Sequence, residues 1–296
     1  MRVANAPLSY GAFEVTVGIY PNVPGPDELL AEMSSAGYEG TELGPPGYLG
    51  EGDELRERLE RHGLALTGGW CPVRFSEPER IDDDLRALAR TLDLFDAAGA
   101  TDARPVLGDG GSDERAMNPG RGEPSLDDDG WRRWADGVER AQALVAERGY
   151  EPALHPHTST FVESPAEIER ALELTDIGML VDTGHLLVGG SDPIQALRDW
   201  GDRVNYVHVK DVRLDVVRQV VDERADVIEG WRRGMFCELG EGDVDLPAFF
   251  DALRDVGYDG WIAVEQDRIP RSDEQLAESA AAQRRNRAWL RENVGV

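Results

Sequence analysis

The chain has 296 residues and is strongly acidic, with 58 Asp and Glu against 31 Lys and Arg and a formal net charge of −27. This charge repels nucleic acid and anionic membranes, so neither is expected as a partner. The sequence has no run of about 18 apolar residues and no signal-peptide core, which predicts a soluble, cytoplasmic protein.

Arginine supplies all the basic residues except one, because Lys210 is the only lysine. Lysine depletion with an excess of Asp and Glu is typical of halophilic proteins, whose hydrated carboxylate surfaces stay soluble at high salt. A lysine that persists under this pressure is not expected on an ordinary surface. Cys71 and Cys237 stand alone, without a C-x-x-C partner, and we expect both to be buried thiols.

The chain repeats one unit, in which an amphipathic helical run, in most cases ending at a glycine, precedes a short β-rich run. Strands are predicted over 2–10, 38–44, 64–70, 102–108, 150–157, 177–185, 203–211 and 258–267. Helices are predicted over 26–36, 54–62, 88–99, 134–149, 164–175, 193–200, 246–257 and 274–293. Helices that alternate with strands imply parallel strands joined by crossover connections.

Eight strands and eight helices in a chain of this length predict an α/β fold, a closed (β/α)8 TIM barrel that forms a single domain over residues 1–296. An open doubly wound sheet would more often carry a Gly-rich phosphate loop after its first strand, and none is present. Long insertions are expected at about 108–130 and 213–236, the second of them helical. Both follow strands, which places them on the catalytic rim of a barrel.

Histidines and carboxylates gather at the carboxyl ends of the last four predicted strands. These residues are His155 and His157 on the fifth strand, Asp182 and His185 at the sixth, His208 on the seventh and Glu265 on the eighth. Such strand ends meet at one rim of a barrel, and imidazole and carboxylate ligands suit a divalent ion such as Mn²⁺, Co²⁺ or Zn²⁺. We therefore predict a metal site formed by His155, Asp182, His208 and Glu265.

Four further residues are predicted to bind substrate at the same rim. Glu42 ends the second strand and Asp267 shares a face with Glu265, while Trp70 ends the third strand and would form an apolar wall. Glu163 precedes Ser164-Pro165-Ala166-Glu167, which has the pattern of a helix capping box, and is left free to reach a ligand. A strand-end salt bridge for Glu42 and core packing for Trp70 are the alternatives.

Several motifs along the chain resemble one family. In chain order they are NAPLSYG, GYEGTELG, GGW, HPHTSTFVESPAEI, DTGH, HVKDVR, GEGDVD and GYDGWIAVEQD. Together they are similar to the xylose-isomerase-like TIM barrels of sugar metabolism, and within these to the inosose (2-keto-myo-inositol) dehydratase branch. The resemblance covers nearly the whole chain.

The resemblance implies a metal held by Glu, Asp, His and Glu on strands five to eight. Asp182, His208 and Glu265 match this pattern, whereas His155 stands where most relatives have Glu. The strand-five ligand is therefore left open between His155, His157 and Glu163. Related AP endonucleases need additional metal histidines on early strands, which this chain lacks.

The resemblance also implies a metal-dependent lyase that dehydrates an inosose-type cyclic polyol ketone, or a related keto-sugar, by α-proton abstraction and β-elimination of water. One alternative is a sugar or keto-sugar isomerase or epimerase that acts through a metal-bound enediolate, and another is a sugar-binding barrel without catalysis. A small polyol or keto-sugar is the expected partner in each case. The oligomeric state is left open, a homo-oligomer included.

Lys210 shares a strand face with His208, which places it beside the predicted metal. As an ammonium it could bind the developing enolate or donate to the departing hydroxyl, and beside a metal ion it could lose its proton and act as a base. Arginine cannot take the second role because it keeps its proton in proteins. Lys210, His185 and His157 are therefore the predicted catalytic residues.

Overall fold

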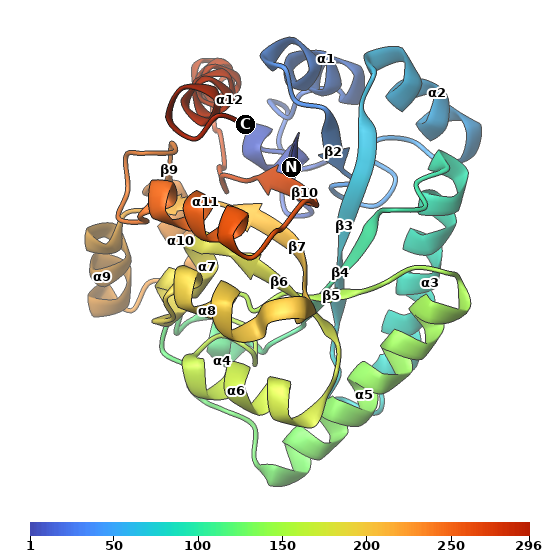
Figure 1. Ribbon diagram of the computed structural model, residues 1–296, viewed down its shortest axis with the longest axis vertical. Helices are drawn as coiled ribbons and strands as arrows, with labels where there is room; N and C mark the ends of the chain where they lie inside the picture. The colour runs from blue at the N-terminus through green and yellow to red at the C-terminus, as the bar shows by residue number, and fades with distance from the viewer.

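The computed structural model describes residues 1–296 and contains eight parallel strands that close into a barrel inside a layer of helices (Figure 1). The barrel strands are β1 (Arg2–Asn5), β2 (Gly40–Glu42), β3 (Ala65–Val73), β4 (Arg104–Asp109), β5 (Ala153–Leu154), β6 (Gly178–Asp182), β7 (Val204–Val209) and β10 (Trp261–Val264). Each pairs with its neighbours in chain order, and β10 closes the ring against β1. The predicted TIM barrel is confirmed.

Helices follow the strands as the sequence pattern predicts, and none of them combines the length and apolar character needed to cross a membrane. The outer helices are α1 (Pro26–Ala36), α2 (Gly52–His62), α3 (Ile81–Ala98), α5 (Asp128–Glu147), α6 (Pro165–Leu174), α8 (Pro193–Trp200), α11 (Leu246–Asp255) and α12 (Asp273–Asn293). Shorter elements are η1 (Pro7–Tyr10), α4 (Asp113–Ala116), α7 (Thr183–Gly189), η2 (Gly201–Arg203), α9 (Leu214–Glu223) and α10 (Val227–Arg232).

Several strands end earlier than the apolar runs predict. β1 stops at Asn5 because Pro7, which has no N–H to donate to a ladder, begins η1. β5 contains only Ala153 and Leu154, and β6 stops at Asp182, which caps α7. The chain beyond each of these points is therefore free to turn inward across the barrel mouth.

The segments that follow β4 and β7 carry additional structure. Between β4 and α5 the chain forms the single-turn helix α4. After β7, β8 (Asp211–Val212) pairs antiparallel with β9 (Phe236–Cys237), so that α9 and α10 lie in a loop closed by this small ladder. Both segments leave the carboxyl ends of barrel strands, the face on which TIM barrels build their sites.

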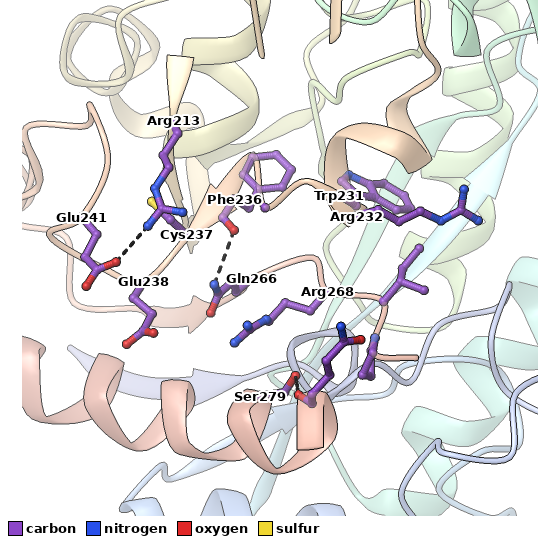
Figure 2. A pocket seen from close by; sticks show the side chains of 14 residues that line it. Arg213, Trp231, Arg232, Phe236, Cys237, Glu238, Glu241, Gln266, Arg268 and Ser279 are labelled. Atoms are coloured by element: carbon purple, nitrogen blue, oxygen red, sulfur yellow. Dashed lines mark hydrogen bonds and ion pairs between the residues drawn. The ribbon is translucent and has the colours of Figure 1, made fainter. Parts of the chain in front are cut away.

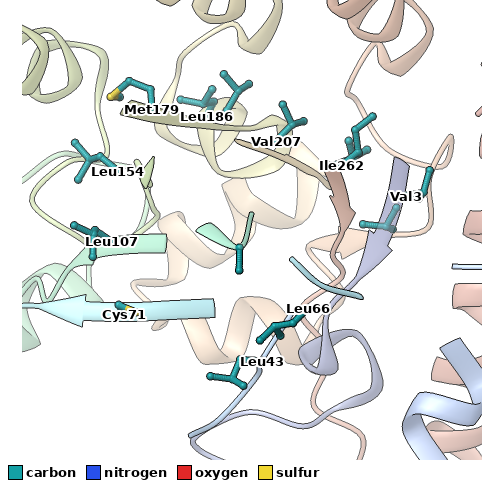
Figure 3. Packing of buried hydrophobic residues seen from close by; sticks show 14 of the residues in the cluster. Val3, Leu43, Leu66, Cys71, Leu107, Leu154, Met179, Leu186, Val207 and Ile262 are labelled. Atoms are coloured by element: carbon teal, nitrogen blue, oxygen red, sulfur yellow. The ribbon is translucent and has the colours of Figure 1, made fainter. Parts of the chain in front are cut away.

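Side chains alternate along each strand between two apolar regions. Those that point outward pack against the helices in the larger core, which includes Val207 and Ile262 (Figure 3). Those that point inward form a small interior cluster that includes Ala4, Leu180 and Tyr206. Inward positions nearer the carboxyl ends are polar instead, because the same alternation that buries Tyr206 also turns His208 into the barrel.

Gly137 marks a close approach between α5 and the chain that follows β3. A Cβ atom there would lie 2.5 Å from the carbonyl oxygen of Phe75 and 2.9 Å from its Cα, and backbone atoms cannot move aside as a side chain can. We expect Gly137→Ala to destabilise the protein by roughly 1–3 kcal/mol, because overpacking outweighs the better helix propensity of alanine. Urea unfolding measures this change.

Gly130→Ala in the same helix is the matched control. Its Cβ would lie 3.1 Å from the Cβ of Leu126 and 3.2 Å from Asp127 Oδ1, which is a looser contact than the one at Gly137. Its stability should change by less than that of Gly137→Ala, and equal losses in the two variants would contradict this account of the contact.

Candidate metal centre and substrate cavity

A layer of buried polar side chains lies directly above the apolar interior of the barrel. His208 stands at its middle: Nε2 is 2.8 Å from Glu42 Oε1, and Nδ1 is 3.1 Å from Glu265 Oε2. Nε2 of His155 lies 3.5 Å from Asp182 Oδ2. The side chains that the sequence assigns to the ends of strands two, five, six, seven and eight therefore converge as predicted.

Lys210 lies just beyond the carboxyl end of β7 and is buried within this layer, with only 1% of its surface exposed. Its ammonium nitrogen is 3.0 Å from Asp182 Oδ2, 3.8 Å from Asp267 Oδ2 and in contact with Glu265. Burial lowers the pKa of this amine, but the three carboxylates outweigh burial and hold its pKa above the ordinary value. The three carboxylates stabilise the ammonium form of Lys210, which suits a hydrogen-bond or proton donor.

Asp182 is held by the start of α7. Its Oδ1 accepts hydrogen bonds from the backbone N–H groups of Gly184 and His185, each at 2.8 Å, which leaves Oδ2 for the cluster. The hydroxyl of Thr183 accepts from Lys210 N at 2.9 Å and donates to Lys210 O at 2.6 Å. Gly184 permits this approach, because a Cβ there would lie 2.7 Å from Lys210 Cβ.

The donor atoms of the cluster fit a metal ion. Ligand-type atoms of His155, Asp182 and His208 lie within 4.8 Å of one another, and so do those of Glu42, His208 and Glu265. The Nδ1–H of His155 donates to the carbonyl of Pro156 at 2.8 Å, which leaves Nε2 with its lone pair towards Asp182. Second-shell hydrogen bonds of this kind fix the tautomer of metal-binding histidines.

The charges of the cluster also favour a cation. Burial lowers the pKa of His208, yet Glu265 and Glu42 outweigh burial and hold its pKa well above the ordinary value. Burial raises the pKa of Asp267 to about 7, and its Oδ2 is buried without a hydrogen-bond partner. The raised pKa of His208 shows that carboxylates outweigh burial at the middle of the cluster, which is an environment that also favours a divalent ion.

A cavity of about 260 Å³ opens onto the cluster. Five residues of the polar layer line it, namely Glu42, His155, His208, Lys210 and Glu265, together with the predicted substrate-binding residues Trp70 and Asp267. Trp70 packs against the rings of His155 and His157, with centroids 5.8 and 5.1 Å away. A small pocket with aromatic walls and a few convergent polar groups is typical of a site for a small molecule.

The two remaining histidines differ in their access to the cavity. His157 lines it, and its Nδ1–H donates to the carbonyl of Thr158 at 2.8 Å, which leaves Nε2 as an acceptor. Burial lowers the pKa of His157 to about 3, so its ring is neutral. His185 does not line the cavity but stacks behind His157 with ring centroids 3.7 Å apart. Direct proton exchange between His185 and substrate, as predicted from the sequence, therefore does not fit this geometry.

Glu163 also departs from the prediction, because it faces a loop and not the cavity. Its Oε1 accepts from the backbone N–H groups of Gly120 and Ser159 at 2.7 Å each, and Oε2 accepts from Gly122 at 3.1 Å. Arg115, fully buried, lies 3.4 Å from the same carboxylate. Glu163 thus ties the loop after β4 to the loop after β5, and no oxygen is left for a metal or substrate.

Two cavity walls could not be assigned from the sequence. Phe13 and Trp231 line the cavity and stack on each other with ring centroids 5.3 Å apart. They come from the loop after η1 and from α10, which are far apart in the chain. Tyr206 was missed as well: its hydroxyl donates to Glu42 Oε1 at 2.9 Å, and the alternation that turns His208 inward could have indicated it.

The fold and this cluster define a class, that of TIM-barrel enzymes with metal-type ligands at the carboxyl ends of the strands. Comparison with known families makes the assignment specific. The chain belongs to the xylose isomerase-like TIM barrel family, which it matches over residues 30–293.

Relatives named inosose dehydratase align with most of the chain. It is 34% identical over 281 residues to an inosose dehydratase of Geobacillus kaustophilus, with 91% of this chain and 88% of the relative covered. It is 30% identical over 286 residues to an inosose dehydratase of Klebsiella pneumoniae subsp. pneumoniae, with 91% and 90% covered.

Solved structures show the same fold at lower identity. The IOLI protein with a bound zinc atom superimposes with a TM-score of 0.70 at 16% identity, and 100% of both chains is covered. An L-ribulose 3-epimerase gives a TM-score of 0.69 at 18% identity, with 98% of this chain and 93% of the epimerase covered.

Asp182→Asn tests the metal site without removing the helix cap, because an amide oxygen can still accept from Gly184 and His185. We expect bound divalent metal to fall from about one ion per chain, with an affinity at least about tenfold weaker. Elemental analysis after purification without chelator measures the content. Asp192→Asn, which alters the equivalent cap of α8, is the control and should keep its metal. Full metal content in Asp182→Asn would show that Asp182 is not needed to bind the metal.

Glu163→Gln tests the structural role assigned to that residue. The new amide would turn an NH₂ group towards backbone N–H donors, so we expect a loss of stability of about 1–3 kcal/mol with unchanged metal content and substrate KM. Glu169→Gln, an exposed change on the following helix, is the control for denaturation experiments. A raised KM with unaltered stability would contradict the structural role and indicate that Glu163 contacts substrate.

Proposed function

We propose that the protein is a metal-dependent hydro-lyase that removes water from a cyclic polyol ketone of the inosose type. The relatives described as inosose dehydratases support this substrate class. The observation that carries the proposal is the fixed ammonium of Lys210, held 3.0 Å from Asp182 beside metal-type ligands at a cavity with aromatic walls.

The reaction needs two proton movements. A base removes the proton on the carbon next to the ketone, the electron pair forms an enolate, and the C–O bond of the hydroxyl one carbon further breaks. The departing oxygen takes up a proton and leaves as water, so the ring loses H₂O and no electrons are exchanged. A donor must therefore reach the leaving oxygen, and an acceptor must reach the α-proton.

His155, Asp182, His208 and Glu265 would hold the metal, with Glu42 as a further neighbour of His208. A bound Mn²⁺, Co²⁺ or Zn²⁺ supplies a Lewis acid that polarises the ketone and an adjacent hydroxyl. The residues that act on protons are those which line the cavity without belonging to this ligand set.

Lys210 is the donor in this proposal. Its pKa is raised by Asp182, Asp267 and Glu265 against the effect of burial, so it is charged at neutral pH and can donate to the leaving oxygen or stabilise the enolate. His157 is the acceptor in this proposal, because it lines the cavity and its Nδ1–H is taken up by the carbonyl of Thr158, which leaves Nε2 as the acceptor. Asp267 Oδ2, which accepts no hydrogen bond within the protein, would accept from substrate hydroxyls.

The competing function is epimerisation of a keto-sugar. Assay of scyllo-inosose with Mn²⁺ or Co²⁺ at high salt separates the two. A dehydratase produces an ultraviolet-absorbing diketone or enol, whereas an epimerase returns a compound of unchanged mass and no new absorbance. If the only product had unchanged mass and no new absorbance, the proposal of a dehydratase would be wrong.

Lys210→Arg tests the role of the amine. Arginine keeps the positive charge but cannot release a proton, so we expect turnover to fall by about 100-fold or more. Metal content and thermal stability, measured on the same samples, show whether the site is still assembled. Nearly full turnover with metal retained would contradict proton donation by Lys210.

A further inference from the structure

A second cavity of about 200 Å³ lies beside the site, bordered by β9, the chain after β10 and the start of α12 (Figure 2). Trp231 lines both cavities and so forms part of the wall between them. Neither the metal-type residues nor the predicted catalytic residues reach the second cavity.

Side chains of the segment after β10 line both cavities, and those that line one cavity point away from those that line the other. Glu265 and Asp267 line the first cavity, whereas Gln266 and Arg268 line the second. This is the alternation of an extended chain, in which successive side chains point to opposite sides. Arg268 therefore lies close to the candidate metal centre along the chain but faces away from it.

Arg268 makes no hydrogen bond and no ion pair through its side chain. Its guanidinium reaches across the cavity on the side of Glu238 (Figure 2), and its Nη1 is buried without a hydrogen-bond partner. Burial lowers its pKa more than the charges of Glu238 and Glu278 raise it, so these carboxylates compensate its loss of water only in part. Unpaired buried donors are rare in folded proteins, because each one loses its hydrogen bonds to water and gains none within the protein.

The carboxylates that line this cavity are paired with arginines other than Arg268. Glu238 forms a bidentate pair with Arg285 at 2.6 and 2.8 Å, and Glu241 is 2.9 Å from Arg213. Arg232 lines the cavity as a further cation and lies 3.7 Å from Glu229. The cavity therefore contains guanidinium donors that the carboxylates of the protein do not satisfy.

We propose that this cavity binds a small oxyanion, a phosphate or carboxylate group whose oxygens accept hydrogen bonds from Arg268. The planar fork of a guanidinium matches both groups and binds them through two parallel hydrogen bonds. The net charge of −27 makes non-specific attraction of anions unfavourable, so saturable binding of an anion requires a dedicated site.

Isothermal titration calorimetry on the metal-containing protein tests this proposal. Sodium phosphate, sodium malonate and sodium chloride are titrated at equal ionic strength in a buffer free of oxyanions. Saturable binding of phosphate or malonate, but not of chloride, is expected, and the stronger of the two identifies the group. Arg268→Gln should weaken it at least about tenfold, since it removes charge-assisted hydrogen bonds. Arg140→Gln, a change at an exposed arginine on α5, should leave it unaltered.

Two results would overturn the proposal. One is the absence of saturable binding by either oxyanion in the wild-type protein. The other is equal affinity in wild type and Arg268→Gln, which would place the anion elsewhere, for instance on the metal. If Arg268→Gln does not fold, Arg268→Lys keeps the charge without the fork and should bind more weakly than wild type. Equal binding by a folded Arg268→Lys would also contradict the role of the fork.

Discussion

The ammonium of Lys210 among Asp182, Glu265 and Asp267 is the interaction around which the mouth of the barrel is organised. Carboxylates buried this deeply are costly unless cations and hydrogen bonds compensate them. The barrel provides both. The alternation of side chains that turns His208 of β7 inward also turns Lys210, just beyond β7, inward, and the start of α7 supplies backbone N–H donors to Asp182. The negative charge that remains uncompensated favours a cation at the proposed metal site.

The sequence was sufficient for the barrel and most of the cluster. Parallel strands bring their carboxyl ends to one rim, so residues that end apolar runs, such as Asp182 and Glu265, could be placed together without coordinates. Glu163 could not be placed, because its surroundings depend on a loop from β4 that folds back onto it through Arg115. The stack of Phe13 on Trp231 joins the loop after η1 to α10, which are distant in the chain, and no periodic sequence pattern indicates such a contact.

At strand five this chain has His155, where the resemblance to the family implies a glutamate ligand. Its Nε2 lies 3.5 Å from Asp182 Oδ2. A neutral imidazole contributes no negative charge. The positive charge of a metal ion would therefore be compensated mainly by the carboxylates that surround Lys210. Glu42, on the second strand, is close enough to His208 to share that task.

The single lysine has a practical consequence. Every other basic side chain is a guanidinium, so the chain offers one side-chain amine to acylating reagents, and that amine is buried at the reaction centre. Labelling at Lys210 therefore reports opening of the barrel mouth against a background limited to the N-terminus.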